Sequence, residues 1–404
     1  MHSHGIRDAL SMTYSFESTP AVVVGACAHG LAMVYGLASG NVPVLLVEAE
    51  DGLHALLTRY AVVHRVESMS GERLLEALEA LRREIVCPGQ PVLMLTNDAM
   101  VQLIGSHQER ISRNYCLAWA HCAARLLPLL DKRNIESQCN VASIRYPRSV
   151  VVNSSDDLTA ALSLGFPLII KPNKPLSGFK TFIPDSPAAA RAFVERNRHE
   201  FPLLVQEFIP GDDQSIHFSA LYLDHGRTLA RFDGHKLRSW PLGHTTIAES
   251  CRNDDVHILA SRFFDGLDIS GPVSLELKRG PEGDWWVIEP TVGRTDFWVG
   301  VCIANGVNLP LIEYLHQTGQ KVDSVAQLDV ALWFNEERDP YGPLWFFGHP
   351  GLRLGRRRPT FCYFGHDDPS VSKAATRTVW STLLRPFAWR LKGLLSRLNI
   401  KSRS

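Results

Sequence analysis

The sequence predicts an α/β protein in which an N-terminal Rossmann-like domain precedes a larger region of mixed helices and strands. The chain opens with the order of a βαβ unit, with a strand at 21–25, a helix at 26–37 and a strand at 43–48. Helical and strand patterns alternate again between 154 and 183, and the pattern from 215 to 289 is mostly β. A length of 404 residues favours two or three subdomains, and 45 % hydrophobic residues suffices for their cores.

The first domain is expected to hold a parallel sheet with right-handed crossovers. The segment 71–84 carries apolar residues at helical spacing, and PVLMLTND at 91–98 indicates a further strand. The turn at 25–30 departs from the dinucleotide pattern G-x-G-x-x-G, because Cys27 stands where the middle glycine would. Two interpretations stay open, a dinucleotide site and a domain that helps to frame a substrate cleft.

The second block predicts another α/β unit. Ser154 or Ser155 can cap a helix that Gly165 closes, and a strand at 167–171 follows. After a glycine-containing loop we expect a second strand near 180–183 and a helix that begins at Ser186-Pro187, since proline suits the first helical position. The segment 203–211 is then a strand that runs into a loop.

Composition excludes some classes of function. Lys plus Arg and Asp plus Glu both number 42, so no net charge draws the chain toward nucleic acid. Eight cysteines without a C-x-x-C pair indicate free thiols in a reducing cytoplasm, and Cys116 and Cys122 around His121 fit no common zinc spacing. The N-terminus lacks the features of a signal peptide, and no apolar run approaches the ~20 residues that span a bilayer. We expect a cytoplasmic protein, soluble or peripheral to a membrane.

Two lysines are the first candidates for a site. Lys171 ends the apolar strand PLIIK, so it is half-buried and needs an anionic partner. Lys180 follows after a turn that contains Gly178, and the pair could reach different phosphates of one polyphosphate. Two solvated surface lysines are an equal alternative at this point.

The segment VQEFIPGDD at the end of the next strand can form a planar binding site. Gln206 and Glu207 end an apolar strand, Phe208 and Ile209 supply apolar walls, and the backbone can bond the edge of a base. Asp213 could accept hydrogen bonds from ribose hydroxyls. An ordinary exit from strand to loop is the alternative.

GHKLRSWP at 234–241 places Lys236 and Arg238 on one face of a strand by period-two alternation. Such a basic pair suits a phosphate or a carboxylate, although a solvated sheet face would look the same.

The clearest pattern is a hairpin formed by PVSLELKR and DWWVIEP. If its turn is centred on Glu282-Gly283, Glu276 and Glu289 lie directly opposite each other on adjacent antiparallel strands. Like charges in that position destabilise a sheet, so the pair predicts a bound cation. Mg²⁺ is the natural choice, because it binds one or two carboxylates and completes its shell with phosphates and water. Two exposed glutamates are the alternative.

The order of these elements resembles the ATP-grasp superfamily over roughly residues 120 to 315. The resemblance implies an N-terminal Rossmann-like (pre-ATP-grasp) domain followed by an ATP-grasp fold, with the nucleotide held between two α+β subdomains. It implies that Lys171 and Lys180 bind the nucleotide, and that the hinge Gln206 to Ile209 holds adenine with Glu207 facing its amino group. It also implies that Asp213 binds ribose and that Glu276 and Glu289 bind magnesium.

QEFIPGDD followed by GHKLRSWP, with Asp131-Lys132, is more similar to the branch that contains D-aspartate ligase and related carboxylate–amine ligases. The closing motif departs from the family pattern E-x-N-P-R, since Thr291 replaces the asparagine that is the third metal ligand. A threonine hydroxyl can still ligate magnesium or hold a water. Arg294 lies one residue late and, with Lys236 and Arg238, is a candidate to bind a substrate anion.

The resemblance implies a ligase that uses Mg-ATP to turn a small-molecule carboxylate into an acyl phosphate and joins it to an amine or similar nucleophile. Other classes stay open. They are a nucleotide-binding regulatory protein without turnover, a nicotinamide-dependent oxidoreductase that uses the first domain, and carbamoyl-phosphate-type chemistry, which usually needs a duplicated chain. The sequence does not separate a monomer from a homo-oligomer, nor does it identify the substrates.

We expect a first domain at 1–120, a nucleotide domain at 121–320 with a lid-type part at about 145–205, and a C-terminal extension at 321–404. After Asp368 the chain has eight basic residues and no acidic one, with aromatic residues and leucines interleaved. A basic amphipathic helix at 387–398 would suit an anionic membrane surface. A helix docked on its own protein and a disordered tail are alternatives.

Overall fold

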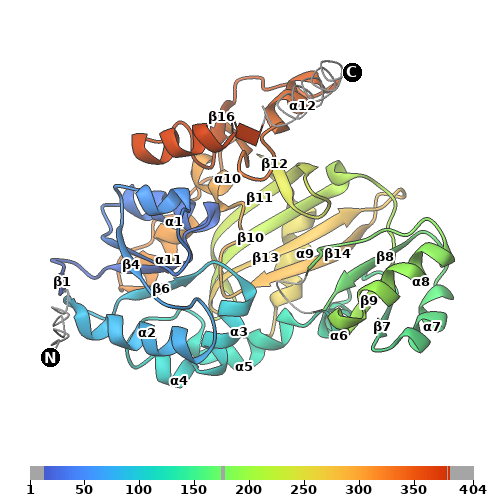
Figure 1. The fold of residues 1–404 in the computed structure, drawn as a ribbon, viewed down its shortest axis with the longest axis horizontal. Helices are drawn as coiled ribbons and strands as arrows, with labels where there is room; N and C mark the ends of the chain where they lie inside the picture. Colours follow the sequence, from blue (N-terminus) through green and yellow to red (C-terminus); the bar gives the residue numbers. More distant parts are fainter. Residues whose placement is uncertain (1–12, 174–177, 380, 383–404) are drawn as a thin grey trace, which may run out of the picture.

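The computed structural model of the chain describes residues 13–173, 178–379 and 381–382. The helix expected at 387–398 lies outside these residues. The larger sheets follow one another along the sequence, and Figure 1 shows the N-terminal domain in blue, a small subdomain in green and a large sheet in yellow to orange. A further two-stranded sheet pairs Tyr14–Ser15 with Ile85–Val86.

The N-terminal domain holds the predicted parallel sheet, in the strand order β4-β3-β2-β6. β2 and β3 are buried along their whole length, as expected for apolar strands covered by helices on both faces. The predicted strand at 91–98 is too long, because Asn97 caps the next helix through its side chain and ends the extended segment. The elements of this domain are β1 (Tyr14–Ser15), β2 (Ala21–Val24), α1 (Ala28–Ala38), β3 (Val44–Glu48), β4 (Val62–Arg65), α2 (Gly71–Glu84), β5 (Ile85–Val86), β6 (Val92–Leu95), α3 (Asp98–Ser106) and α4 (Gln108–Ile111).

A small subdomain follows, with the antiparallel strand order β7-β9-β8. A capping box between Ser154 and Asp157 starts its first helix, and Ser186 caps its second, as the sequence predicts. The expected strand at 180–183 is reduced to a single bridge between Ile170 and Phe182. Two helices precede the subdomain, α5 (Ala123–Leu126) and α6 (Lys132–Ala142), and both share a core with the N-terminal domain. The elements of the subdomain are β7 (Ser149–Val152), α7 (Leu158–Leu162), β8 (Leu168–Pro172), α8 (Pro187–Arg196) and β9 (Leu203–Glu207).

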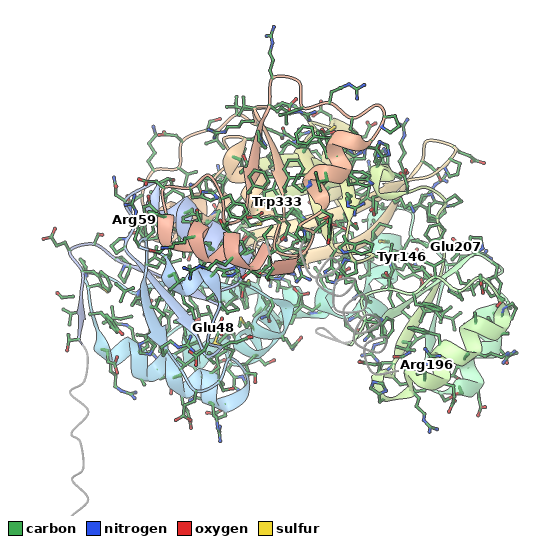
Figure 2. All side chains as sticks on the ribbon, turned by 45° about the horizontal axis from the view of Figure 1, so that its top comes forward. Glu48, Arg59, Tyr146, Arg196, Glu207 and Trp333 are labelled. Carbon is green, nitrogen blue, oxygen red and sulfur yellow. The ribbon has the colours of Figure 1, made fainter. Side chains whose placement is uncertain are left out.

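The subdomain has an apolar core of its own, which includes Val152, Leu168, Ile170 and Val194. Figure 2 shows its labelled residues Glu207 and Arg196 at the opposite end of the molecule from Glu48 and Arg59 of the N-terminal domain. The subdomain is therefore packed as a unit separate from the large sheet.

The large sheet has seven strands in the order β14-β13-β10-β11-β12-β15-β16. It extends past residue 320, because β15 pairs with β12 and β16 pairs with β15. Its elements are β10 (Ile216–Asp224), β11 (Arg227–Ser239), β12 (Thr245–Ser250), α9 (Asp254–Phe264), β13 (Gly271–Arg279), β14 (Trp285–Val292), α10 (Val299–Ala304), α11 (Leu309–Gln317), β15 (Ala331–Phe334), α12 (Gly342–Gly348) and β16 (Arg358–Phe361). Short 3₁₀ helices are η1 (His54–Leu57), η2 (Ala120–Cys122), η3 (Leu127–Leu130), η4 (Ser155–Asp157), η5 (Arg198–Glu200) and η6 (Asp213–Ser215).

The C-terminal region returns to the N-terminal domain. Asp368, whose side chain is buried, accepts hydrogen bonds from Thr58 Oγ1 at 2.6 Å and from Tyr35 Oη at 3.3 Å. Residues 369–379 then form a helix. The structure places all eight cysteines as free thiols. Among the described residues, no helix combines the length and the apolar character that crossing a bilayer requires.

Candidate nucleotide and metal site

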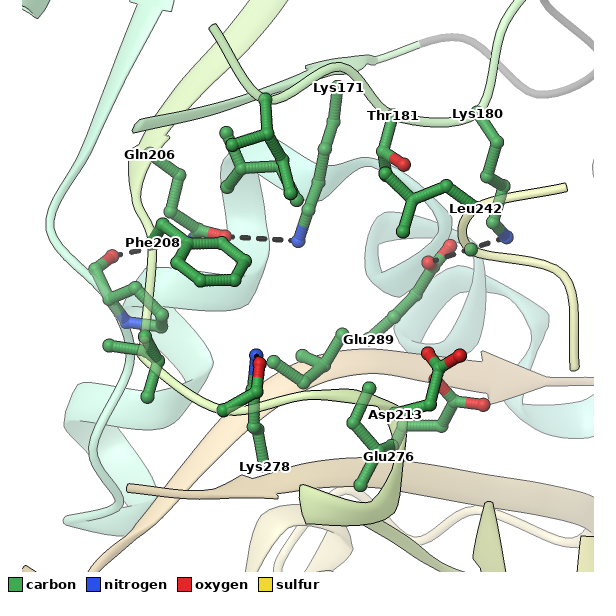
Figure 3. A pocket seen from close by; sticks show the side chains of 18 of the residues that line it. Lys171, Lys180, Thr181, Gln206, Phe208, Asp213, Leu242, Glu276, Lys278 and Glu289 are labelled. Carbon is green, nitrogen blue, oxygen red and sulfur yellow. Dashed lines mark hydrogen bonds and ion pairs between the residues drawn. The ribbon is translucent and has the colours of Figure 1, made fainter. Parts of the chain in front are cut away.

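A cavity of about 310 Å³ lies between the small subdomain and the large sheet. Figure 3 shows Lys171, Lys180 and Gln206 on one side of it, and Glu276 and Lys278 on the other. Most of the residues singled out in the sequence line this one cavity: Lys171, Lys180, Gln206, Glu207, Phe208, Ile209, Asp213, Lys236, Glu276 and Glu289.

Lys171 is buried at the end of β8 and has a neutral partner. Its Nζ donates to Gln206 Oε1 at 3.0 Å, and the Gln206 amide donates in turn to Ser149 Oγ at 2.9 Å. Burial, reinforced by the charges of Lys132 and Lys180, lowers the pKa of Lys171 to about 8. Because the Lys171 ammonium is hydrogen-bonded to the neutral Gln206 amide and not to an acid, it can still pair with an anion that enters the cavity.

Glu289 is surrounded by lysines. Lys132 Nζ lies 3.4 Å from Glu289 Oε1, and Lys180 Nζ lies 3.7 Å from Oε2. Burial acts to raise the pKa of Glu289, but Lys132, Lys180 and Lys171 together hold it well below its usual range. In return, Glu289 raises the pKa of Lys180. The carboxylate is therefore ionised and within reach of three cations that could move to a phosphate.

Glu276 and Glu289 are direct partners on β13 and β14, as the sequence predicts. Next to the turn the register is shifted by one residue from the expected one, since Arg279 pairs with Trp285. A bulge that leaves Ile288 unpaired corrects the register before Glu289 is reached. The predicted pairing of the acids is thus right, while the assumed regular hairpin is wrong.

The carboxylate of Glu276 lies 3.4 Å from Lys236 Nζ. Burial raises the pKa of Glu276, and Lys236 opposes this effect. Two carboxylates that face each other at the cavity wall offer the hard oxygen donors that Mg²⁺ prefers. These residues therefore fit a magnesium ion, with the remaining positions left to phosphate oxygens and water.

The chain is similar to known proteins in sequence and in structure. No family model matches the chain. The chain is 22 % identical over 313 residues to D-aspartate ligase of Enterococcus faecium (strain Aus0004), covering 70 % of this chain and 72 % of that protein. Its structure is similar to that of an N5-carboxyaminoimidazole ribonucleotide synthetase in complex with ADP, with a TM-score of 0.64, 10 % identity and coverage of 91 % and 98 % of the two chains. It is also similar to an L-amino acid ligase from Bacillus licheniformis, with a TM-score of 0.58, 13 % identity and coverage of 75 % and 74 %.

The chain has the ATP-grasp fold. The cavity lies between the small subdomain and the large sheet of this fold.

The side chains of the predicted hinge have partners within the protein. Arg148 binds the Glu207 carboxylate through its side chain at 2.8 Å and through its backbone N–H at 3.0 Å, and Gln206 accepts from Lys171. That Glu207 faces the amino group of adenine remains a prediction. Phe208 and Ile209 do line the cavity, and Lys278 Nζ lies 4.3 Å from the centre of the Phe208 ring.

Asp213 lies at the cavity wall on η6. Its carboxylate accepts hydrogen bonds from the backbone N–H of Ser239 at 2.6 Å and from Ser239 Oγ at 2.9 Å. It is thereby held in place, and binding a ribose there remains a prediction.

Of the three cations predicted to hold a substrate anion, Lys236 alone lines the ATP-grasp cavity. The alternation that would put Arg238 beside it is broken by bulges between Lys236 and Ser239. Arg238 bonds Asp339 at 2.6 Å instead. The two basic residues therefore do not form the predicted pair.

Arg294 also lies outside the cavity lining. Its Nε is 2.6 Å from the Asp98 carboxylate at the start of α3, so it ties the closing segment to the N-terminal domain. Burial opposes its charge, yet Asp98 and Asp296 raise the pKa of Arg294.

Thr291 donates its hydroxyl to Asp296 Oδ2 at 2.8 Å, and Ser274 Oγ lies 3.2 Å from the same oxygen. Thr291 is the neighbour of Glu289 on the same face of β14, although it does not line the cavity directly. Asp296, which the sequence analysis did not single out, thus places a buried carboxylate behind the position of the missing asparagine.

The dinucleotide interpretation of the first domain meets an obstacle at Glu48. In a Rossmann site an acid near this place binds the ribose. Here the buried Glu48 carboxylate accepts from the backbone N–H groups of Ala26 at 2.8 Å, Ala49 at 2.7 Å and Glu50 at 2.9 Å. These bonds use the carboxylate to shape the 25–30 turn.

The lining also includes residues that the sequence analysis did not single out as site residues, among them Lys132, Leu242, Gly243 and Lys278. Lys278 follows Glu276 by two on β13, and period-two alternation could have found it. Lys132 begins α6, and only the family resemblance drew attention to it. Leu242 and Gly243 belong to the β11–β12 turn, which reaches over the cavity and carries no local signal of doing so. A β-carbon on Gly243 would lie 2.8 Å from Lys180 Cγ, so the turn packs closely on that lysine.

The surroundings of this turn are electropositive. Burial, together with Arg338, Lys180 and Lys236, lowers the pKa of His244 to about 4. Far from the cavity, His121, His225 and Asp268 bring three potential metal-ligand atoms within 4.8 Å. Arg125 already pairs with Asp268 at 2.9 Å, and neither Cys116 nor Cys122 belongs to the group.

Proposed function

We propose that the chain is an ATP-dependent ligase that activates a small-molecule carboxylate as an acyl phosphate and joins it to an amine or a similar nucleophile. The observation that carries the proposal is the facing pair Glu276 and Glu289 inside a cavity lined by five lysines: Lys132, Lys171, Lys180, Lys236 and Lys278. A polyphosphate with a divalent cation matches both sets of charges.

Each side chain has a task in this proposal. Lys171, aimed by Gln206, and Lys180 bind phosphate oxygens of ATP, while Phe208 and Ile209 enclose the adenine. Glu276 and Glu289 would hold magnesium, which supplies charge neutralisation to the phosphates when bound.

The reaction needs no covalent bond to the enzyme. A carboxylate oxygen of the substrate attacks the γ-phosphorus, the bond to the β-γ bridging oxygen breaks, and ADP leaves. The amine then attacks the acyl carbon, phosphate leaves, and the amine loses a proton. The chain contributes alignment and charge stabilisation.

The similarity to D-aspartate ligase and to an L-amino acid ligase supports amino acids as the first substrates to test. ADP release is measured with Mg-ATP and pairs of amino acids, and a second series contains hydroxylamine. A correct carboxylate gives a hydroxamate that depends on magnesium, even when the natural amine is absent. ADP release without hydroxamate would refute the acyl-phosphate mechanism.

A regulatory protein of the same fold is the second candidate, because Thr291 stands at the position of a metal-binding asparagine and points its hydroxyl at Asp296. That protein would bind Mg-ATP with a rise in melting temperature and release no ADP with any acid in the panel.

A further inference from the structure

An exposed apolar patch lies beside the cavity. It consists of Trp240 and Leu242 in the β11–β12 turn and of Tyr341, Leu344 and Phe347 at α12. Leu344 is 69 % exposed, Phe347 65 % and Trp240 54 %, whereas side chains of this size are normally covered. We call these five residues the apical patch.

The two parts of the apical patch are held together from beneath. The guanidinium of Arg238 lies 5.7 Å from the ring centre of Trp240 and 4.7 Å from that of Trp345 on α12. Asp339, just before α12, pairs with the same guanidinium at 2.6 Å. Figure 1 shows α12 above the end of β12, at the edge of the molecule.

The exposure of α12 follows from how the helix is packed. Phe346 is buried against Phe334, with 5.7 Å between ring centres, and belongs to a core cluster with Leu237 and Ile247. With Phe346 directed inward, Leu344 and Phe347 on either side of it are left exposed. The patch is thus a rigid surface of an anchored helix.

The segment that carries α12 and follows it is basic. The segment 340–366 contains four arginines and no aspartate or glutamate. Arg353, Arg356 and Arg358 are exposed, and none of them forms an ion pair with a described residue. Arg338, immediately before Asp339, is exposed and has no carboxylate partner in the described part of the chain.

We propose that the apical patch docks on an anionic membrane surface. Aromatic and leucine side chains enter the boundary between head groups and acyl chains, while the arginines pair with anionic head groups. A second copy of this chain is a poorer partner, because a symmetric contact would bring the same unpaired arginines together. Charge complementarity therefore selects the lipid surface.

Docking would orient the cavity. Leu242 belongs to the patch, and both Leu242 and its neighbour Gly243 line the nucleotide cavity. The patch thus continues to the cavity mouth, and a docked molecule would open toward the lipid–water interface. The proposal does not depend on ligase activity, because binding to vesicles is measured without turnover.

The test is flotation of the full-length protein with vesicles of phosphatidylcholine and phosphatidylglycerol at three to one, and with pure phosphatidylcholine. We expect binding to the anionic vesicles that falls with added salt. The double variant Leu344→Glu/Phe347→Glu should lower the bound fraction about tenfold, since two apolar anchors are lost and two negative charges are added. Val141→Glu/Ile258→Glu is the matched control, because these side chains are also exposed and lie on α6 and α9.

Unchanged flotation of the Leu344→Glu/Phe347→Glu variant, with an unchanged melting temperature, would overturn the proposal and assign any binding to another part of the chain. Sedimentation velocity identifies the other partner. If the same variant turns a dimer into a monomer while vesicle binding stays at the wild-type level, the patch is a contact between copies and the membrane proposal is wrong.

Discussion

Glu289→Gln gives opposite effects on metal-free ATP and on Mg-ATP, because the carboxylate faces lysines as well as Glu276. The substitution removes one negative charge from the cavity and keeps the shape of the side chain. At an effective dielectric constant of about 20, a unit charge at about 8 Å from a phosphate is worth about 2 kcal/mol. Screening reduces this to roughly a tenfold change in affinity.

We therefore expect the dissociation constant of metal-free ATP to fall about tenfold in Glu289→Gln, while magnesium no longer strengthens binding. ADP formation should be lost. Isothermal titration calorimetry with EDTA and with MgCl₂ measures both constants. Glu282→Gln is the control, since Glu282 is exposed at the tip of the same hairpin. A Glu289→Gln protein that keeps the wild-type ratio of the two constants would show that Glu289 does not hold the metal.

Further predictions concern the pKa values of the lysines, the closing motif and the small subdomain. Burial lowers the pKa values of Lys171 and Lys278 to about 8. Between about pH 8 and 10.5 the unfolded chain therefore holds more protons than the folded protein, so the stability of the free protein should rise with pH. The affinity for ATP should fall over the same window, because the two lysines lose their charge. Thermal melts and calorimetry across pH check both signs, and Lys171→Met should flatten each curve. Because the buried Asp296 carboxylate adds negative charge behind Thr291, Asp296→Asn should weaken Mn²⁺ binding seen by electron paramagnetic resonance, and Thr291→Asn should keep it. Equal affinities in wild type and Asp296→Asn would show that the Asp296 charge does not contribute to metal binding. Ser154→Ala should cost the small subdomain about 1 kcal/mol, visible as faster amide exchange in α7, and unchanged exchange would contradict the capping box.

Much of the fold could be predicted because its signals are local. The helix at 71–84 agrees with α2 at both ends, since its apolar spacing and charged face are complete within the segment. The ATP-grasp fold is confirmed by the similar structures. The expected strand at 180–183 failed because one pairing, between Ile170 and Phe182, is all that joins it to β8.

The site was predictable where a residue's role depends on its own strand. Lys171 at the end of an apolar strand, and Glu276 opposite Glu289, follow from burial and period-two alternation. The prediction that Arg238 shares a strand face with Lys236 was wrong, because bulges interrupt the alternation. Its ion-pair partner, Asp339, is 101 residues away in the sequence. The ion pair between Glu207 and Arg148 was likewise not predictable, since Arg148 lies 59 residues away, just before β7.

The sequence by itself determined the local features of this protein, which are a βαβ opening, two lysines, an apolar hinge and a facing acid pair. Each of these features lies in a short run of residues, and the spacing within that run sets its geometry. The tertiary structure alone decided which charged residues from distant segments lie next to one another. It brought Lys132 to Glu289, put Asp296 behind Thr291 and laid the β11–β12 turn over the cavity. The physical reason is that electrostatic partners are chosen by distance, and distances between segments far apart in the chain follow from the packing of sheets and cores.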